Sequence, residues 1–425
     1  MAHIVIKNVG PIKEVELDLN KINVFMGPQS SGKSTIAKII SYCSWYEKNV
    51  ILTSKLTKDF YKDLLEFHNL EDNYFSEDSL IEYQSNNCHI FFPGKNVERL
   101  NVEPIVSFDN LFKNEKIEYI PAERNFVTIP GIGKYNESRD NILSFLYDWF
   151  EAKRETKKEH NYVYPIKSLS QNAYYYNQED DSDNLVIENG MEMKLRHASS
   201  GLMSVTPLVI VFDYITNVIY SKNRIKSPFE VINIQSKIEG LDDINKDRIK
   251  KLVDGIDNLR SYLNKDLPIS FSEKDIDNMQ KELNKVLGFD SDYNYSKVII
   301  EEPELNLFPD TQRDLIYYML SVLNKEKRDH QLVLTTHSPY ILFSLNNCMM
   351  GGLVNNKIPK DKQKDFESFP AWINPKKVSI YEIHNGVLKC IQDEDGIIED
   401  NYLNQAYKEN SAEYLSLLNY YDDEE

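Results

Sequence analysis

The 425-residue sequence is poor in cysteine and in positive charge, and each shortage excludes a class of protein. Lysine and arginine number 49 against 67 aspartates and glutamates, which gives a net charge of −18. Binding to nucleic-acid phosphates requires a surplus of lysine and arginine, so this balance counts against a protein that coats nucleic acid, although a local basic patch stays open. The four cysteines include no CxxC pair, which excludes a disulfide framework and a zinc ribbon: Cys43, Cys88, Cys348 and Cys390.

The sequence also lacks a secretion leader and an obvious membrane span. Its first residues contain no basic start followed by an apolar stretch. The most apolar stretch, residues 202–220, contains Pro207, Asp213 and Asn217. We expect it to be too short and too polar to cross a bilayer, and to form a buried helix instead. Together with the scattered cysteines, this favours a cytoplasmic protein without a membrane partner.

A glycine-rich loop lies between an apolar strand and a helix near the start of the chain. Residues 22–26 form a short apolar run typical of a strand buried on both faces, and apolar residues recur at helical spacing over residues 36–43. The loop matches G-x-x-x-x-G-K-[ST], in which backbone N–H groups face a phosphate, the lysine adds charge and Ser34 can ligate Mg²⁺. We therefore predict that nucleotide phosphates bind to Gly27, Pro28, Gln29, Ser30, Ser31, Gly32, Lys33, Ser34 and Thr35.

Acidic residues follow a second apolar strand at residues 298–300. An apolar strand that ends in two carboxylates suits metal-assisted hydrolysis, in which Glu301 holds the magnesium or its water and Glu302 polarises the attacking water. Acidic strand ends are common on an acidic surface, and the glycine-rich loop is what favours the chemical interpretation. With Ser34, Glu301 is thus a predicted metal ligand.

A histidine follows a third apolar strand at residues 332–334. Because the carboxyl ends of neighbouring parallel strands meet at one sheet edge, His337 would stand beside the glycine-rich loop and could hydrogen-bond a γ-phosphate. A loop histidine that bonds to backbone is the alternative. We predict Glu302, His337 and Lys33 as the catalytic residues.

A serine–glycine pair precedes the apolar stretch 202–220. At a helix start, Ser199, Ser200 and Gly201 would offer free N–H groups to an anion. An ordinary serine N-cap explains the same residues equally well.

In this order the four motifs resemble those of ABC-type P-loop ATPase heads of the AAA family, a group that includes SMC-like and RecF-like heads and the overcoming-lysogenization-defect (OLD) family. Residues 6–12 and 302–309 are more similar to the OLD and RecF-like branch than to transporter cassettes. The resemblance implies an α/β P-loop NTPase fold, with a mixed β-sheet flanked by helices and with helical insertions. It also implies ATP and Mg²⁺ as cofactors.

The same resemblance implies a homodimer or higher oligomer in which Ser200 and Gly201 of one subunit close over the γ-phosphate bound by the other. Residues 121–124 are similar to a Pro-x-x-Arg segment of such ATPases. The sequence departs from the pattern at Leu202 and Met203, where a second glycine and a glutamine usually stand, and at Glu301, where aspartate is common. Gln84 is a candidate for the glutamine of a Q-loop.

We divide the chain accordingly into a head and two inserted segments. Residues 1–50, 117–220 and 293–425 form the ABC-type head. Residues 51–116 form one insertion, and residues 221–292 form a helical insertion that acts as a lid or binds a partner.

OLD nucleases carry a TOPRIM domain after the ATPase, and we expect none here. The chain then resembles a stand-alone ATPase subunit that regulates a separate effector, a nuclease, as in anti-phage defence systems of the Septu and PARIS kinds. The alternatives are a RecF-like DNA-repair ATPase that acts on DNA, a transporter cassette, and an ATP sensor with low turnover.

Overall fold

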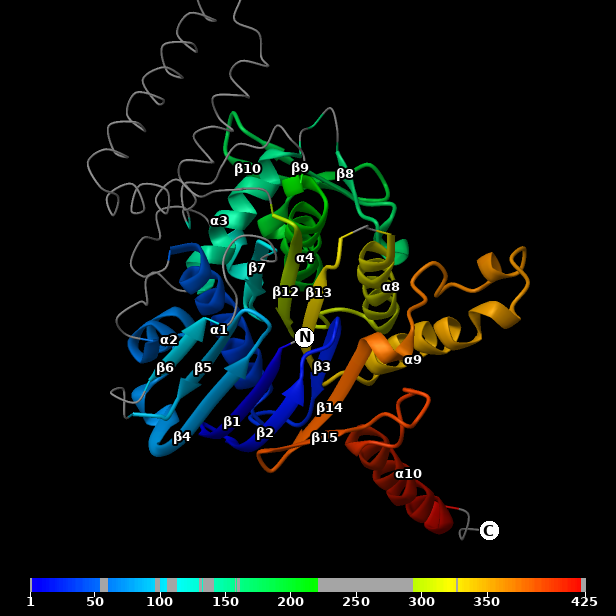
Figure 1. The fold of residues 1–425 in the computed structure, drawn as a ribbon. Helices are drawn as coiled ribbons and strands as arrows, with labels where there is room; N and C mark the ends of the chain where they lie inside the picture. The colour runs from blue at the N-terminus through cyan, green and yellow to red at the C-terminus, as the bar shows by residue number, and fades with distance from the viewer. Residues whose placement is uncertain are drawn as a thin grey trace, which may run out of the picture.

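The computed structural model shows one large mixed sheet with helices on both faces (Figure 1). It describes residues 2–53, 60–95, 100–104, 113–129, 132, 141–156, 158, 161–220, 293–325 and 328–421. The proposed insertion 221–292 lies outside these residues. The mixed sheet and its flanking helices confirm the predicted α/β class.

Five neighbouring strands form the parallel part of the sheet. Their order is β7 (Glu115–Ile120), β12 (Tyr295–Glu301), β13 (Gln331–Thr336), β3 (Ile22–Met26) and β14 (Val378–His384). Val298, Ile299 and Ile300 are completely buried, as expected for a parallel strand covered on both faces. All five strands therefore bring their carboxyl ends to one edge, and the segments singled out in the sequence end or follow four of them: β3, β13, β12 and β7.

Six further strands continue the sheet beyond β14, all antiparallel to their neighbours except β15 and β2, which pair in parallel. They are β15 (Val387–Cys390), β2 (Ile12–Asp18), β1 (His3–Val9), β4 (Phe75–Gln84), β5 (Cys88–Phe92) and β6 (Asn101–Pro104), in that order. Residues 51–116 thus add three strands to the edge at β1, together with α2 (Phe60–His68). Gln84 ends β4, which four strands separate from β3, so it lies away from the glycine-rich loop.

Helices cover the two faces of the sheet and divide the core into two clusters. One cluster contains Val298 and Ile300, and the other contains Ile299, because successive strand residues point to opposite faces. The helices are α1 (Lys33–Thr53), α3 (Asn141–Arg154), α4 (Ser200–Thr216), α8 (Pro309–Lys325) and α9 (Pro339–Val354). The last helix, α10 (Tyr402–Tyr421), has no buried residue and extends away from the sheet (Figure 1). A small separate sheet contains β8 (Tyr162–Val163), β9 (Ala173–Asn177), β10 (Ser182–Val186) and β11 (Glu192–Lys194).

The helical stretch Ser200–Tyr220 is, among the described residues, the one candidate long and apolar enough to cross a membrane by length and composition. Our expectation that this stretch is too short and too polar for a span is therefore wrong. Burial decides its place instead, because 72% of the apolar window lies inside the protein. The predicted buried helix is confirmed as α4, which packs against β7 and β12.

Candidate active site

The carboxyl ends of four parallel strands place the predicted residues at one edge of the sheet. The glycine-rich loop follows β3, His337 follows β13, Glu301 ends β12, and residues 121–124 follow β7. These strands are immediate neighbours in the order β3, β13, β12, β7. Segments about 300 residues apart in the sequence therefore meet, as expected where parallel strands end together.

The glycine-rich loop adopts backbone conformations that require glycine at both ends. Gly27 has φ +154°, and a Cβ atom there would lie 2.5 Å from the carbonyl oxygen of Ile383. Gly32 has φ +105°, and its Cβ would lie 2.9 Å from the Ile12 side chain. The loop between them is tightly curved, and Ser30 has a left-handed φ of +59°. Such curvature turns successive N–H groups toward one point, as phosphate binding requires.

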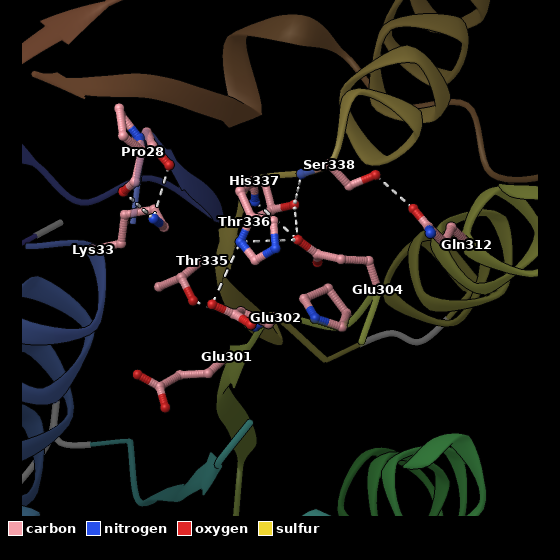
Figure 2. A network of polar contacts seen from close by, with 12 residues as sticks. Pro28, Lys33, Glu301, Glu302, Glu304, Gln312, Thr335, Thr336, His337 and Ser338 are labelled. Atoms are coloured by element: carbon pink, nitrogen blue, oxygen red, sulfur yellow. Dashed lines mark hydrogen bonds and ion pairs between the residues drawn. The ribbon is translucent and has the colours of Figure 1, made fainter. Parts of the chain in front are cut away.

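Lys33 begins α1 and folds back over the loop. Its Nζ donates to the carbonyl oxygens of Gly27 at 2.8 Å and Pro28 at 2.7 Å (Figure 2). Burial lowers the pKa of Lys33, while the charges of Glu302, Glu304 and Glu301 act in the opposite direction. The lysine is therefore a buried ammonium group whose present partners are neutral carbonyls.

The other loop residues differ in exposure. Gln29 and Ser30 are exposed, Ser31 and Ser34 are half-buried, and Thr35 is buried in the first turn of α1. The Oγ of Ser31 is buried and has no hydrogen-bond partner. A hydroxyl in that state is a ready donor for an anion in the loop.

His337 and Glu302 form a pair at the same edge. His337 Nδ1 lies 3.4 Å from Glu302 Oε1 (Figure 2). Their interaction lowers the pKa of Glu302 and raises the pKa of His337, and burial opposes both shifts. Glu302 has φ +42°, a left-handed conformation that is rare for a residue with a side chain. Backbone strain of this kind is concentrated at functional sites.

Glu304 is a site residue that the sequence analysis missed. Its Oε1 accepts hydrogen bonds from Thr336 Oγ1 at 2.7 Å and from the His337 backbone N–H at 2.9 Å. It lies 3.9 Å from His337 Nδ1. Glu304 thus fixes the loop that carries the histidine. The signal was present in the sequence, because only Pro303 separates Glu304 from the predicted acidic pair.

Glu301 is separate from this cluster in Figure 2 and is buried. Glu301 Oε1 and Glu304 Oε2 have no hydrogen-bond partner in the structure. A buried unpartnered polar group costs about 1–3 kcal/mol, so such atoms are expected where a ligand completes the set.

A magnesium ion bound with a nucleotide fits this donor set. Mg²⁺ prefers oxygen ligands and is held by one or two carboxylates or hydroxyls together with phosphates and waters. Glu301 supplies an unpartnered carboxylate oxygen, and Ser34 supplies a hydroxyl at the start of α1. The described residues contain no group of three His, Cys, Asp or Glu that could hold a metal by themselves, so phosphates would have to complete the site.

The serine–glycine pair begins α4. Ser199 is the N-cap, and its side chain accepts a hydrogen bond from the Leu202 N–H at 3.3 Å, as the N-cap interpretation predicts. Ser200 is exposed, and a Cβ on Gly201 would lie 2.8 Å from the Asn306 carbonyl oxygen. The start of α4 therefore packs against the loop that follows β12, while its exposed end stays accessible. Whether it binds an anion remains a prediction.

The sequence matches two families of known domains. The family described as AAA domain matches residues 3–288, and the family described as AAA ATPase domain matches residues 288–342. No curated protein matches the sequence.

Three solved structures with a similar chain course share little sequence with this chain. The SMC head domain from Thermotoga maritima has 9% identity and a TM-score of 0.38, covering 92% of this chain and 98% of its own. A dimeric bacterial ABC transporter cassette has 13% identity and a TM-score of 0.28, with 92% and 99% covered. The recombination mediator protein RecF has 9% identity and a TM-score of 0.28, with 92% and 97% covered. These low values carry no conclusion about this chain.

The family assignment rests on the sequence matches. The first match spans more than half of the chain and includes the glycine-rich loop, and the second includes Glu301, Glu302 and His337. The chain therefore belongs to the AAA domain family, and it is a P-loop ATPase.

Proposed function

We propose that this ATPase binds ATP with Mg²⁺ in the loop 27–35, hydrolyses it with water oriented by Glu302, and acts as a dimer that regulates a separate effector. The observation that carries the proposal is the Glu302–His337 pair at 3.4 Å, at the sheet edge that also holds the buried Lys33. Around the pair are buried oxygens without partners, on Ser31, Glu301 and Glu304.

Each side chain has a distinct part in the proposed reaction. Lys33 exchanges its two carbonyl acceptors for oxygens of the β- and γ-phosphates. Glu302 stays ionised because its pKa is lowered, so it is a weak base and contributes mainly by holding the attacking water in line. His337, whose pKa is raised by its hydrogen bond with Glu302, would donate a hydrogen bond to the γ-phosphate. Mg²⁺ held by Ser34 and Glu301 would neutralise charge on the phosphates.

The dimer is proposed from the surface around the start of α4. Ser199 and Ser200 are exposed there, with unpaired N–H groups of a helix start. Phe308 is 82% exposed and belongs to the same loop as Asn306, against which Gly201 packs. A large exposed aromatic next to a helix N-terminus suits a face covered by a second copy. In that dimer, Ser200 and Gly201 of one copy would approach the nucleotide of the other.

The effector and its setting extend the proposal beyond the ATPase. By its resemblance to stand-alone subunits, the chain acts in the cytoplasm on a separate nuclease in anti-phage defence. Residues 1–50, 117–220 and 293–425 are the head in this scheme. Residues 221–292 are the lid or the partner-binding segment.

The substitution Glu302→Gln tests the proposal. Loss of the carboxylate that holds the attacking water in line should lower kcat by about 10²-fold or more, since misplacement of a reacting group by about 1 Å costs about that much. Phosphate release measures turnover, calorimetry measures ATP affinity, and light scattering measures the mass with ATP and with ADP. We expect retained ATP binding and a dimer that persists with ATP.

The control makes the same chemical change elsewhere. Glu188 is exposed in the turn between β10 and β11, so Glu188→Gln should turn over like the parent. Parental turnover of Glu302→Gln would contradict the assignment, and a monomer under every nucleotide condition would contradict the dimer.

A further inference from the structure

Arg124 is a buried arginine next to Glu301 and Glu302. Among the residues that the structure describes, its hydrogen-bond partners are backbone carbonyls. It begins a short 3₁₀ segment (Arg124–Thr128) after β7, and it is 0% exposed. Its guanidinium donates five hydrogen bonds, to the carbonyl oxygens of Glu301 and Glu302 at 3.0 Å each, Ser204 at 3.1 Å, and Pro121 and Pro303 at 3.3 Å each. A guanidinium has five N–H donors, so this fork matches its full donor inventory.

The charge of Arg124 persists despite its burial. Burial lowers its pKa to about 10, and the charges of Glu304, Glu302, Glu123 and Glu301 oppose that change. At neutral pH the group is therefore cationic. Hydrogen bonds from a charged donor are stronger than those from a neutral one, so the planar fork holds its acceptors in a fixed arrangement.

The acceptors belong to two elements with different parts in the proposed reaction. Glu301 ends β12, and Glu302 and Pro303 follow it directly, with a strained φ of +42° at Glu302. Ser204 lies in α4, four residues after Ser200. Pro207 has no N–H for the Met203 carbonyl, so the backbone bonding of this helical turn is already incomplete. One side chain thus bridges the helix proposed to face the partner's nucleotide and the residue proposed to orient water.

We propose that Arg124 is a positioning residue that couples α4 to Glu302 within one copy. This inference rests on the proposed function. When Ser200 and Gly201 contact the nucleotide bound by the second copy, α4 takes up a fixed position. The guanidinium, which is bonded to Ser204 of α4, then holds the carbonyls of Glu301 and Glu302 in a matching position. Glu302 then holds water in line only in the assembled dimer. An isolated copy therefore hydrolyses little ATP.

The first test is Arg124→Lys, which keeps the charge and removes the fork. An ammonium on a flexible stem bonds one element at a time, so β12 and α4 are no longer held together. We expect unchanged ATP affinity by calorimetry and a kcat about 10²-fold lower, as misplacement of a reacting group by about 1 Å produces. Parental specific activity should rise with protein concentration as dimers form, whereas the variant's residual activity should stay flat.

The matched control is Arg313→Lys. Arg313 is a partly exposed arginine whose Nη2 lies 2.9 Å from Asp314 Oδ1, and it has no part in the site. It should keep both the parental kcat and the parental concentration dependence. A merely structural role for Arg124 would lower stability and leave that concentration dependence in place, which would overturn the proposal.

A double-mutant cycle with Ser200→Ala isolates the coupling. Removing one donor to the developing phosphate charge costs about 10²-fold. If Arg124 passes the position of α4 to Glu302, the double variant should be about as slow as the slower single variant. Losses that multiply to about 10⁴-fold would mean that the two residues act independently, and would overturn the inference.

Two further measurements keep the test decisive. If Arg124→Lys does not fold, hydrogen exchange of residues 297–305 is followed in Ser200→Ala and in the parent when ATP is added. Protection should rise in the parent and stay low in Ser200→Ala, and equal protection would refute the coupling.

Glu302→Gln is assayed alongside. If its turnover is parental, the proposed function fails. If its turnover is lost while the losses in the double-mutant cycle multiply, only this inference fails.

Discussion

Charged side chains are buried at both ends of the parallel strands β7 and β12, but the two groups differ in whether their polar atoms have partners within the protein. At the amino ends, Lys297 and Glu115 are buried 3.3 Å apart, Lys297 donates to Ser44 at 2.8 Å, and Tyr295 donates to Glu115 at 2.8 Å. At the carboxyl ends, Glu301 and Glu304 each have a buried oxygen without a hydrogen-bond partner. We call the Lys297–Glu115 cluster the closed end, because its charged groups have polar partners, and the Glu301–Glu304 cluster the open end, because each carboxylate has an oxygen without one.

This difference separates charge that supports the fold from charge that awaits a ligand. A buried ion pair repays its desolvation only when its remaining donors and acceptors are also used, as at Lys297. Ser44 lies in α1, so the closed cluster also anchors the helix that begins at Lys33. The open end leaves the cost of burial uncompensated, and a bound nucleotide with its metal would supply the missing partners.

The largest expected effect is at the open end. Glu301→Gln removes a buried carboxylate whose Oε1 has no hydrogen-bond partner. Mg²⁺-dependent ATPase activity should therefore fall by about 10²–10³-fold, while the free energy of unfolding stays the same or rises by about 1 kcal/mol. Turnover across a magnesium titration and urea unfolding measure the two quantities. A stability loss as large as the one expected for the closed end would break the comparison.

At the closed end the effects should be reversed. Lys297→Met leaves Glu115 buried without its cation, so the free energy of unfolding should fall by about 3 kcal/mol, with the kcat of the folded fraction unchanged. Adding Glu115→Gln removes the buried unpaired charge and should recover most of the lost free energy of unfolding. Urea unfolding of both variants decides it; equal instability of the single and double variants would argue against a paired charge.

A smaller effect should appear in the pH dependence of the open end. The pKa of Glu302 is lowered below 4.5, so its share of the pair's stability is present above pH 4.5 and is lost as pH falls through the lowered value. The pKa of His337 is raised above 6.5, so its share is present below pH 6.5 and is lost as pH rises through the raised value. The stability difference between the parent and His337→Asn should therefore peak between pH 4.5 and 6.5.

The size of that peak is limited by exposure. The side chains are 38% and 26% exposed, and solvent screens such a pair, so we expect at most about 1 kcal/mol. Urea unfolding at intervals across the pH range measures it. A difference that keeps growing above pH 8 would show that another interaction of His337 dominates.

Local patterns were sufficient to predict the strands and loops that build the open end. Each predicted residue follows an apolar strand, and parallel strands place such residues at one edge, so Lys33, Glu302 and His337 could be grouped before the structure was known. The ATPase assignment is confirmed by the family matches. The individual catalytic and metal-binding roles stay predictions.

The features that the sequence did not predict depend on tertiary contacts. The position of Glu304 depends on the left-handed φ of Glu302, which turns the chain so that the carboxylate reaches Thr336. The acceptors of Arg124 are backbone carbonyls, which any sequence would provide, so no residue pattern could identify them. The strands at residues 75–104 carry polar residues on one face, and their place at the sheet edge depends on pairing with β1.

The walls of the glycine-rich loop come from opposite ends of the chain. Ile12 in β2 limits the space at Gly32, and Ile383 in β14 limits the space at Gly27. A fragment that stops before β14 would retain every motif residue named above, but it would lack Ile383, whose carbonyl oxygen limits the space at Gly27. The proposed binding of a triphosphate therefore depends on the completed sheet, and we expect truncation of the chain before β14 to abolish it even though the loop lies near the other end of the sequence.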